Sequence, residues 1–403
     1  MMKICVLGGC GAVGSVAIQM LAETGVFDEI IIGDVNEERA LEIAGACEPG
    51  VATVIEVDAE DPENIKRAID GVDVVLNCVG PFYHYGPKIL KATIEAGINY
   101  VDVCDDFDAT EVCLTMDEAA KKAGVAALIG MGSSPGIANV LVRFCADHLL
   151  DECESIDIYH AHGGAEVEGP AVVKHRIHSM SVPIPVFIDG KAKRLNMFEP
   201  EGRAFEETTD FADVGTYDVY LYPHPETITL PMYIPDVKRV TNLGLVLPPS
   251  YAELIKEIVR LGIIGEDPIM VQGHSIVPLE FAVAHILSQR ARLTAEAGLA
   301  EAMGCLKIVI KGRKEGAPST YIFSMSSRGH GMGEGTGIPA ALGSILMATG
   351  KIKGKGVLPP EACVDPLDLI SLAKTHVKMD GKSGVPLKIE HIDADGKVEE
   401  IAI

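Results

Sequence analysis

Short apolar runs alternate with longer amphipathic stretches over the first 130 residues of the chain. The apolar runs are rich in β-branched side chains and predict strands, at residues 3–7, 29–34, 54–58, 74–78, 100–103 and 127–130. The stretches between them predict helices, at residues 13–22, 37–46, 62–69, 87–96 and 109–123. Apolar strands separated by single helices are typical of parallel βαβ units. We therefore predict an α/β fold whose first domain, residues 1–135, is a Rossmann-type doubly wound parallel sheet.

The regular alternation ends after Ser134-Pro135-Gly136. Beyond a helix expected at residues 137–149, the chain mixes strands and helices, with strands at residues 155–160, 183–188, 218–222 and 306–311 and helices at residues 251–261 and 281–300. We predict a second, mixed α+β domain over residues 136–330, which binds substrate and forms a dimer interface. Residues 331–403 are expected to return in part to the first domain, through a helix opening at residues 335–339 and another after Pro366, and to end in a hairpin around residues 393–397.

The composition of the chain excludes several classes of partner. Lys and Arg number 34 against 58 Asp and Glu, and the formal net charge of −24 repels phosphate backbones and anionic lipid surfaces. Gly, Pro or charged residues interrupt each apolar run well short of the roughly 20 residues that a membrane-spanning helix needs. The 10 cysteines lie singly, and the first strand leaves no room for a signal peptide before the glycine-rich loop. We expect a soluble cytoplasmic protein with no nucleic-acid or membrane partner.

A glycine-rich loop follows the first predicted strand and opens the first predicted helix. Its sequence, Gly9-Cys10-Gly11-Ala12-Val13-Gly14, matches the G-x-G-x-x-G pattern of dinucleotide-binding domains. Gly9 allows the tight turn, Gly11 lets the backbone approach a pyrophosphate, and Gly14 allows the helix to pack closely on the strand. The free N–H groups of the helix N-terminus attract the anion. The alternative is a plain tight turn, which would not explain why strand, loop, helix and acid coincide.

The acid is Asp34, which ends the second predicted strand about 20 residues after Gly14, where a carboxylate hydrogen-bonds a ribose 2′-hydroxyl. A carboxylate about 4 Å from a 2′-phosphate repels it by several kcal/mol at intermediate dielectric. Asp34 therefore favours NAD over NADP, although Arg39 lies one helical turn further on and softens that preference. The alternative role of Asp34 is to cap the helix that starts near Asn36.

Residues at the ends of the other predicted strands are expected to contact the cofactor, because ligands of open α/β sheets bind beyond the carboxyl ends of the strands. The expected cofactor-binding residues are Gly9, Gly11, Ala12, Val13, Asp34, Val35, Asp58, Asn77, Cys78, Val79, Gly80, Pro81 and Cys104. Asp58 is placed near the adenine ring, and the stretch 77–81 near the nicotinamide. Asp105 and Asp106 follow the fifth strand, where they are either functional carboxylates or solvated loop acids and helix caps.

With these segments identified, the chain resembles the saccharopine dehydrogenase (saccharopine reductase) family. The resemblance is carried by the glycine loop with Asp34 and by the segments at residues 74–106, 130–141 and 335–361. It implies a Rossmann domain followed by a mixed α/β domain, and hydride transfer between a nicotinamide cofactor and the carbon of a carbon–nitrogen bond. Relatives such as lysine 6-dehydrogenase and carboxynorspermidine dehydrogenase imply amino-acid or polyamine-like substrates. The chain departs from the family in favouring NAD where glutamate-forming members generally use NADP, and in having no tryptophan, with residues 175–181 at the corresponding place.

Hydride transfer at an amine carbon needs a group that handles the amine proton and polar anchors for the substrate. The candidate catalytic residues are Asp105, which can balance an iminium charge or take a proton, His84 and His224. The candidate substrate-binding residues are Phe82, Asp106, His175, Arg176 and His178. His84 belongs to Tyr83-His84-Tyr85, which either relays protons or only closes the cleft. His224 lies between two prolines that fix its direction in a loop.

The histidines also raise the question of a metal site. His160 and His162 are two residues apart on a predicted strand and therefore share a face, while His175 and His178 are three apart. Four histidines in a short span are compatible with zinc, but neither cysteines nor carboxylates at suitable spacing complete a site. We therefore expect hydrogen-bonded structural histidines and no metal.

The sequence leads to an NAD-dependent oxidoreductase acting on a carbon–nitrogen bond of a small amine or amino-acid substrate. Three alternatives stay open: a lysine 6-dehydrogenase-like amino-acid dehydrogenase, reduction of a carbon–carbon double bond as in enoyl reductases, and a nucleotide-binding sensor without catalysis. We also expect a homodimer, since α/β dehydrogenases commonly bury apolar surface of their second domain between subunits.

Overall fold

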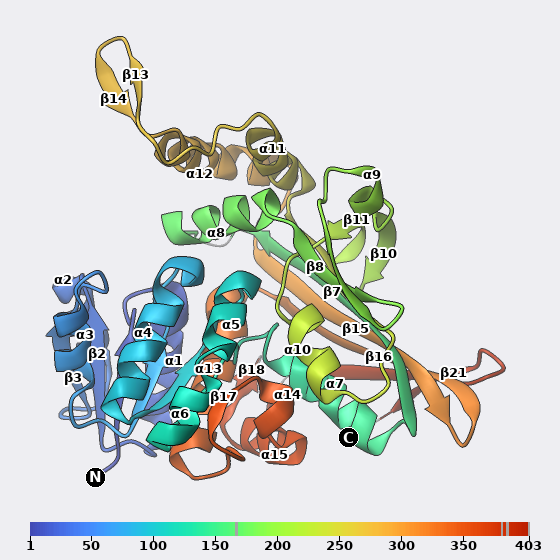
Figure 1. Cartoon of the computed structure of the whole chain (residues 1–403), viewed down its shortest axis with the longest axis horizontal. Helices are drawn as coiled ribbons and strands as arrows, with labels where there is room; N and C mark the ends of the chain where they lie inside the picture. Colours follow the sequence, from blue (N-terminus) through green and yellow to red (C-terminus); the bar gives the residue numbers. More distant parts are fainter. Residues whose placement is uncertain (166–167, 380–381, 384–386, 402–403) are drawn as a thin grey trace.

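The computed structural model of the protein describes residues 1–165, 168–379, 382–383 and 387–401. A seven-stranded parallel sheet forms the centre of one half of the molecule, which we call the first half because residues 1–128 supply six of its strands. The strand order is β17-β6-β5-β4-β1-β2-β3 (Figure 1). Its strands are β1 (Lys3–Leu7), β2 (Glu29–Asp34), β3 (Ala52–Glu56), β4 (Val74–Asn77), β5 (Asn99–Asp102), β6 (Ala126–Leu128) and β17 (Gly356–Leu358). The predicted Rossmann-type fold is confirmed.

The helices of this half connect successive strands. They are α1 (Ala12–Thr24), α2 (Glu37–Ala46), α3 (Pro62–Ile69), α4 (Phe82–Ala96), α5 (Phe107–Leu114) and α6 (Asp117–Ala123). Two predictions were wrong in their bounds: α4 begins at residue 82 and not at 87, and the single helix expected at 109–123 is two helices. Pro87 lies inside α4, so a proline within a helical pattern did not mark its first turn. The third strand ends at Glu56, two residues before Asp58.

A ten-stranded mixed sheet forms the second half, with β8 and β9 attached at β12 to the main order β10-β11-β12-β7-β15-β16-β20-β21. Its strands are β7 (Glu152–Gly164), β8 (Ile184–Ile188), β9 (Lys191–Leu195), β10 (Glu207–Phe211), β11 (Gly215–Leu221), β12 (Arg239–Leu247), β15 (Ala302–Lys314), β16 (Ala317–Arg328), β20 (Leu387–Ile392) and β21 (Val398–Ile401). The helices are α7 (Ile137–His148), α8 (Pro170–Ser181), α9 (Pro200–Arg203), α10 (Glu226–Tyr233), α11 (Pro249–Arg260) and α12 (Pro278–Glu296). The expected mixed α/β second half is confirmed.

A two-stranded hairpin, β13 (Ile269–Val271) and β14 (His274–Ile276), extends away from the rest of the molecule beyond α11 and α12 (Figure 1). Its apolar side chains are exposed: Ile269 by 53%, Met270 by 69% and Val271 by 43%.

The C-terminal segment contributes to both halves. Helix α13 (Met332–Ala348) packs against α1, where an added Cβ at Gly337 would lie only 2.6 Å from the carbonyl oxygen of Val13. Small residues thus let the two helices approach closely beside the glycine loop. β17 extends the first sheet, while β20 and β21 form the expected terminal hairpin on the second. The remaining elements are α14 (Pro360–Cys363), α15 (Pro366–His376), β18 (Lys378–Met379) and β19 (Lys382–Ser383).

The 10 cysteines are all free. Among the described residues, no helix is both long enough and apolar enough to cross a bilayer.

Candidate active site

The glycine loop lies between β1 and α1, at the carboxyl edge of the first sheet. Gly8 has a φ of +75°, and a Cβ there would lie 2.8 Å from the main chain of Cys78, so the loop rests directly on the end of β4. A Cβ at Gly14 would lie 2.3 Å from the carbonyl oxygen of Gly8. The cap residue of α1, Gly11, offers no side chain, so the first N–H groups of the helix are left for an anion. The loop fits the pyrophosphate of a dinucleotide.

Asp34 is placed by β2 at the same edge. Its Oδ2 atom accepts a hydrogen bond from the backbone N–H of Cys10 at 2.9 Å, and its Oδ1 atom accepts one from the N–H of Asn36 at 3.1 Å. The carboxylate therefore lies against the glycine loop, as the ribose of a dinucleotide requires. The helix cap proposed as its alternative role belongs to Asn36, whose side chain accepts from the N–H of Arg39.

The other expected cofactor residues lie along this edge. Asn77 is fully buried, donates to the Tyr100 hydroxyl at 2.9 Å and accepts from the N–H of Val79, and so fixes the turn that contains Cys78, Gly80 and Pro81. Val35 is 66% exposed, and Asp58 lies on the surface, where it accepts from the N–H of Glu60. Cys104 is buried after β5. The edge thus offers turns and exposed backbone along the path that a dinucleotide would follow.

Three residues that the sequence singled out separately come together in a carboxylate–histidine cluster, formed by Asp105, Asp106 and His175. His175 comes from α8 in the second half, and the two aspartates follow β5 in the first. The His175 Nδ1 atom lies 2.7 Å from Asp106 Oδ1, and its Nε2 atom lies 3.4 Å from Asp105 Oδ2. Asp106 also accepts from the N–H of Tyr83 at 2.9 Å and is 2% exposed. The cluster joins the two halves beside the carboxyl edge of the first sheet, which we call the cofactor edge because the expected cofactor residues lie along it.

The charges of the carboxylate–histidine cluster are coupled. Burial alone would lower the pKa of His175, but the neighbouring Asp105 and Asp106 raise that pKa to about 9. Burial alone would raise the pKa of Asp106, but His175 lowers it below its ordinary value. His175 is therefore protonated at neutral pH. Two carboxylates around one imidazolium leave the cluster with a net charge of about −1.

A second histidine of α8 makes a parallel contact across the interface. His178 lies 2.7 Å from Asp108 through Nε2 and stacks on the ring of Tyr83, with 4.1 Å between ring centroids. Tyr83 and Asp108 were not among the predicted site residues. The only signal for them in the sequence was their position next to residues already selected, in Tyr83-His84-Tyr85 and in the loop after Asp106. His178 therefore helps to hold α8 against the first half.

Three expected site residues lie elsewhere. Phe82 is 6% exposed and packs in the hydrophobic core of the first half. His84 lies in the first turn of α4, not in a loop, and pairs on the surface with Glu60 at 2.6 Å. Arg176 is 2% exposed and pairs with the buried carboxylate of Glu168, which also accepts from the Tyr251 hydroxyl at 2.7 Å. Helical periodicity explains Arg176: it follows His175 by one residue and so points to a different side of α8.

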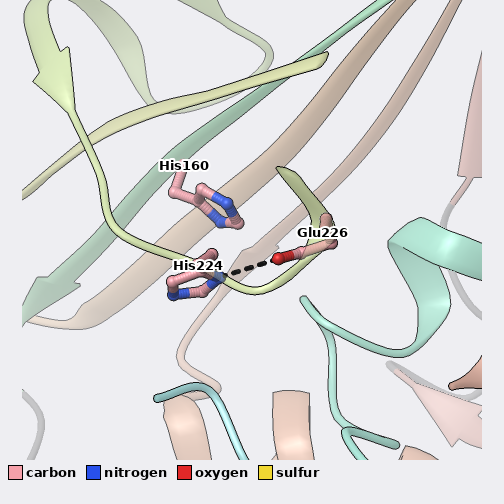
Figure 2. A group of neighbouring side chains, drawn as sticks. All are labelled: His160, His224 and Glu226. Carbon is pink, nitrogen blue, oxygen red and sulfur yellow. Dashed lines mark ion pairs between the residues drawn. The ribbon is translucent and has the colours of Figure 1, made fainter. Parts of the chain in front are cut away.

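His224 lies in a third group, with His160 and Glu226 (Figure 2). His224 precedes α10, Glu226 is the first residue of that helix, and His160 comes from the middle of β7. Their exposed fractions are 6%, 0% and 8%. Glu226 was not predicted, although it stands two residues after His224 in the sequence. The Ser134 hydroxyl, from the loop after β6, contacts both Glu226 Oε1 and His160 Nε2, the latter at 3.4 Å.

Comparison with known proteins agrees with this arrangement. The family model for the saccharopine dehydrogenase NADP binding domain matches residues 4–128, and that for the saccharopine dehydrogenase C-terminal domain matches residues 132–374. The chain is 26% identical to carboxyaminopropylagmatine dehydrogenase of Synechocystis over 382 residues, 90% of this chain and 92% of the relative. It is 24% identical to carboxynorspermidine synthase of Vibrio cholerae over 334 residues, 76% of this chain and 77% of the relative.

A solved structure has the same fold. Apo saccharopine dehydrogenase (L-Glu forming) from Saccharomyces cerevisiae aligns with a TM-score of 0.68 at 16% sequence identity, over 97% of this chain and all of that one. The glycine loop, the position of Asp34 beside that loop and the two family matches agree with one another. The chain belongs to the saccharopine dehydrogenase family and is an NAD(P)-dependent oxidoreductase of that type.

Proposed function

We propose that the protein transfers a hydride at the C–N bond of a secondary amine that joins an amino-acid-derived carbon to a di- or polyamine-like amine. The relatives that match most of the chain support this substrate class, because their names refer to carboxyaminopropylagmatine and carboxynorspermidine. The observation that carries the proposal is the carboxylate–histidine cluster. Its net negative charge at the cofactor edge favours a cationic amine over a neutral or anionic substrate.

Within this cluster, Asp105 is the residue that we place against the substrate nitrogen. The side chain of Asp105 is 38% exposed, whereas that of Asp106 is 1% exposed and that of His175 is 13% exposed. Asp105 can therefore approach a ligand while the other two hold it. Its carboxylate stabilises the positive charge of an iminium group and can take the proton of the amine. The bound nicotinamide supplies or accepts the hydride.

We propose NAD as the preferred cofactor, although the matching family model is described as NADP binding. The support is Asp34, whose carboxylate is fixed by two backbone N–H groups and so cannot easily turn away from a 2′-phosphate. A carboxylate about 4 Å from a 2′-phosphate repels that phosphate by several kcal/mol at intermediate dielectric.

The test follows NADH absorbance while the enzyme is offered aldehydes and oxo acids, each with a diamine, agmatine, lysine, glutamate or ammonium. Every positive reaction is repeated with NADPH. We expect amine-dependent NADH oxidation that Asp105→Asn reduces at least about 100-fold, the lower range for loss of a proton-handling side chain. Asp189→Asn is the matched control, since its side chain is 84% exposed on the turn after β8 and pairs with Lys193, which is not a site residue. Turnover of an enoyl substrate without amine, or NADH binding without any turnover, would contradict the proposal.

We also propose a homodimer that uses the hairpin arm. Ile269 and Met270 are exposed by more than half of their surface on a hairpin that extends from the body of the molecule (Figure 1), and Phe281 nearby is 54% exposed. Exposed apolar side chains gathered in this way are typical of interaction sites. Light scattering should give the mass of a dimer, and Met270→Lys should shift it toward the monomer. A monomeric wild type at micromolar concentration would refute the proposal.

A further inference from the structure

From the group in Figure 2 we infer a divalent transition-metal site, with zinc as the best fit, whose ligands are His160, His224 and Glu226. One ligand atom from each of the three residues lies within 4.8 Å of the other two. Neighbouring ligands in a tetrahedral zinc site lie about 3.3 Å apart, given bonds of about 2.0–2.1 Å. Side-chain rotations that move these ligand atoms by about an ångström would therefore bring them to the spacing of a tetrahedral site.

The burial of Glu226 supports this inference. Its side chain is fully buried, and its Oε2 atom has no hydrogen-bond partner among the described residues. The partners of this carboxylate in the described part of the chain are the Ser134 hydroxyl and the His224 imidazole, whose Nδ1 atom lies 3.6 Å away and also has no hydrogen-bond partner there. A buried charge without a compensating charge is costly. A divalent cation between Glu226 and the two imidazoles would satisfy both orphaned atoms.

The donor set fits a transition metal better than calcium or magnesium. Two imidazole nitrogens and one carboxylate oxygen suit Zn²⁺, while calcium and magnesium prefer oxygen ligands alone. The Ser134 hydroxyl lies beside both Glu226 and His160.

The carboxylate–histidine cluster provides a contrast. It also holds three potential ligands close together. Its histidine is already charged and paired, because the two aspartates raise the pKa of His175 to about 9. An imidazolium cannot coordinate a cation. The two clusters therefore divide into one that binds metal and one that binds the substrate amine.

The experiment measures metal binding without substrate or cofactor. The full chain is stripped with a chelator, dialysed against Zn²⁺ and analysed for metal content, and Co²⁺ is added as a spectroscopic probe. We expect one Zn²⁺ per chain. We also expect bound Co²⁺ to show the visible absorption that is typical of a low coordination number. His224→Gln should weaken Zn²⁺ binding by more than the about 10- to 100-fold that loss of an outer-shell partner costs. The matched control His175→Gln should keep wild-type metal content.

Two results would overturn the inference: a wild type without stoichiometric Zn²⁺, or a folded His224→Gln variant that binds Zn²⁺ as tightly as the wild type. Circular dichroism shows whether each variant is folded. If His224→Gln does not fold, X-ray absorption of the zinc-loaded wild type decides, because two imidazoles in the first shell support the site and their absence refutes it. Failure of the amine-dependent assay leaves this result untouched, since metal content is measured without turnover.

Discussion

Removing the charge of Asp106 tests one of the charge couplings that join the two halves of the protein. Asp106 is 2% exposed and lies 2.7 Å from the Nδ1 atom of His175, so Asp106→Asn keeps the shape of the side chain and removes one of two negative neighbours. One pKa unit corresponds to about 1.4 kcal/mol. The rise of the His175 pKa from 6.5 to about 9 therefore corresponds to about 3 kcal/mol of interaction that favours the imidazolium.

The sign of the pH dependence follows from the raised pKa. A histidine whose pKa is higher in the folded than in the unfolded state stabilises the fold fully below pH 6.5. That contribution is lost as the pH rises toward 9 and through it. Asp106 acts at the other end of the scale: its lowered pKa gives stability that is lost only as the pH falls into the acidic range. A titration between pH 6 and 10 therefore reports His175.

The assay is an NMR titration of the enzyme with isotope-labelled histidine rings, in which His175→Gln identifies the signal. We expect a midpoint near 9 in the wild type, and a midpoint lower by about one unit or more in Asp106→Asn, since an opposite charge this close shifts a pKa by about one to three units. His178→Gln is the control, because it removes a neighbouring imidazole of the same helix. A wild-type midpoint near 6.5, or one that Asp106→Asn leaves unchanged, would refute the coupling.

Three further outcomes can be measured. Asp34→Ala should weaken NADH binding about 10-fold or more and reduce the preference for NADH over NADPH, as titration with each nucleotide would show. An unchanged ratio of the two affinities would mean that Asp34 does not select the cofactor. Gly14→Ala should abolish dinucleotide binding and destabilise the fold by several kcal/mol in thermal unfolding, because its Cβ would lie 2.3 Å from the Gly8 carbonyl oxygen. Burial raises the pKa of Glu361 to about 7, so its ionisation increasingly costs stability from pH 4.5 to 7. Glu361→Gln should raise the free energy of unfolding by up to about 3 kcal/mol at pH 8 and by little at pH 4, as urea denaturation at the two pH values would show.

Local signals explain which elements of the first half could be predicted. The bounds of α2 and α3 were predicted correctly because a side chain caps each helix: Asn36 accepts from the N–H of Arg39, and Asp61 accepts from the N–H of Glu63. The start of α4 carries no such cap, since Pro81 stands at that position. The strands of the first sheet are buried on both faces and therefore appear in the sequence as continuous apolar runs. Only the short length of these runs distinguishes them from helices.

The long strands of the second sheet were underestimated for a related reason. β7 spans Glu152–Gly164, whereas the apolar pattern predicted only six of these residues. His160 and His162 interrupt that pattern, yet both rings lie near the ring of Tyr222, at 5.4 and 6.2 Å between centroids. The shared face expected from their spacing is confirmed. Contacts with an aromatic ring thus allow histidines inside β7, although the pattern of apolar residues indicated that the strand ends there.

The two clusters show why site residues could be proposed singly but not assembled. Asp106 and His175 are 69 residues apart, one in the loop after β5 and the other in α8, so only the packing of α8 on the first half makes them neighbours. His160 and Glu226 are likewise joined through β7 and α10. Zinc was set aside at the sequence level because suitable spacing of carboxylates was missing, but spacing constrains ligands only within one element. Glu226 begins α10 two residues after His224, and these two residues lie together beside His160 of β7. This proximity is the reason to measure metal content before assigning His224 a role in proton transfer.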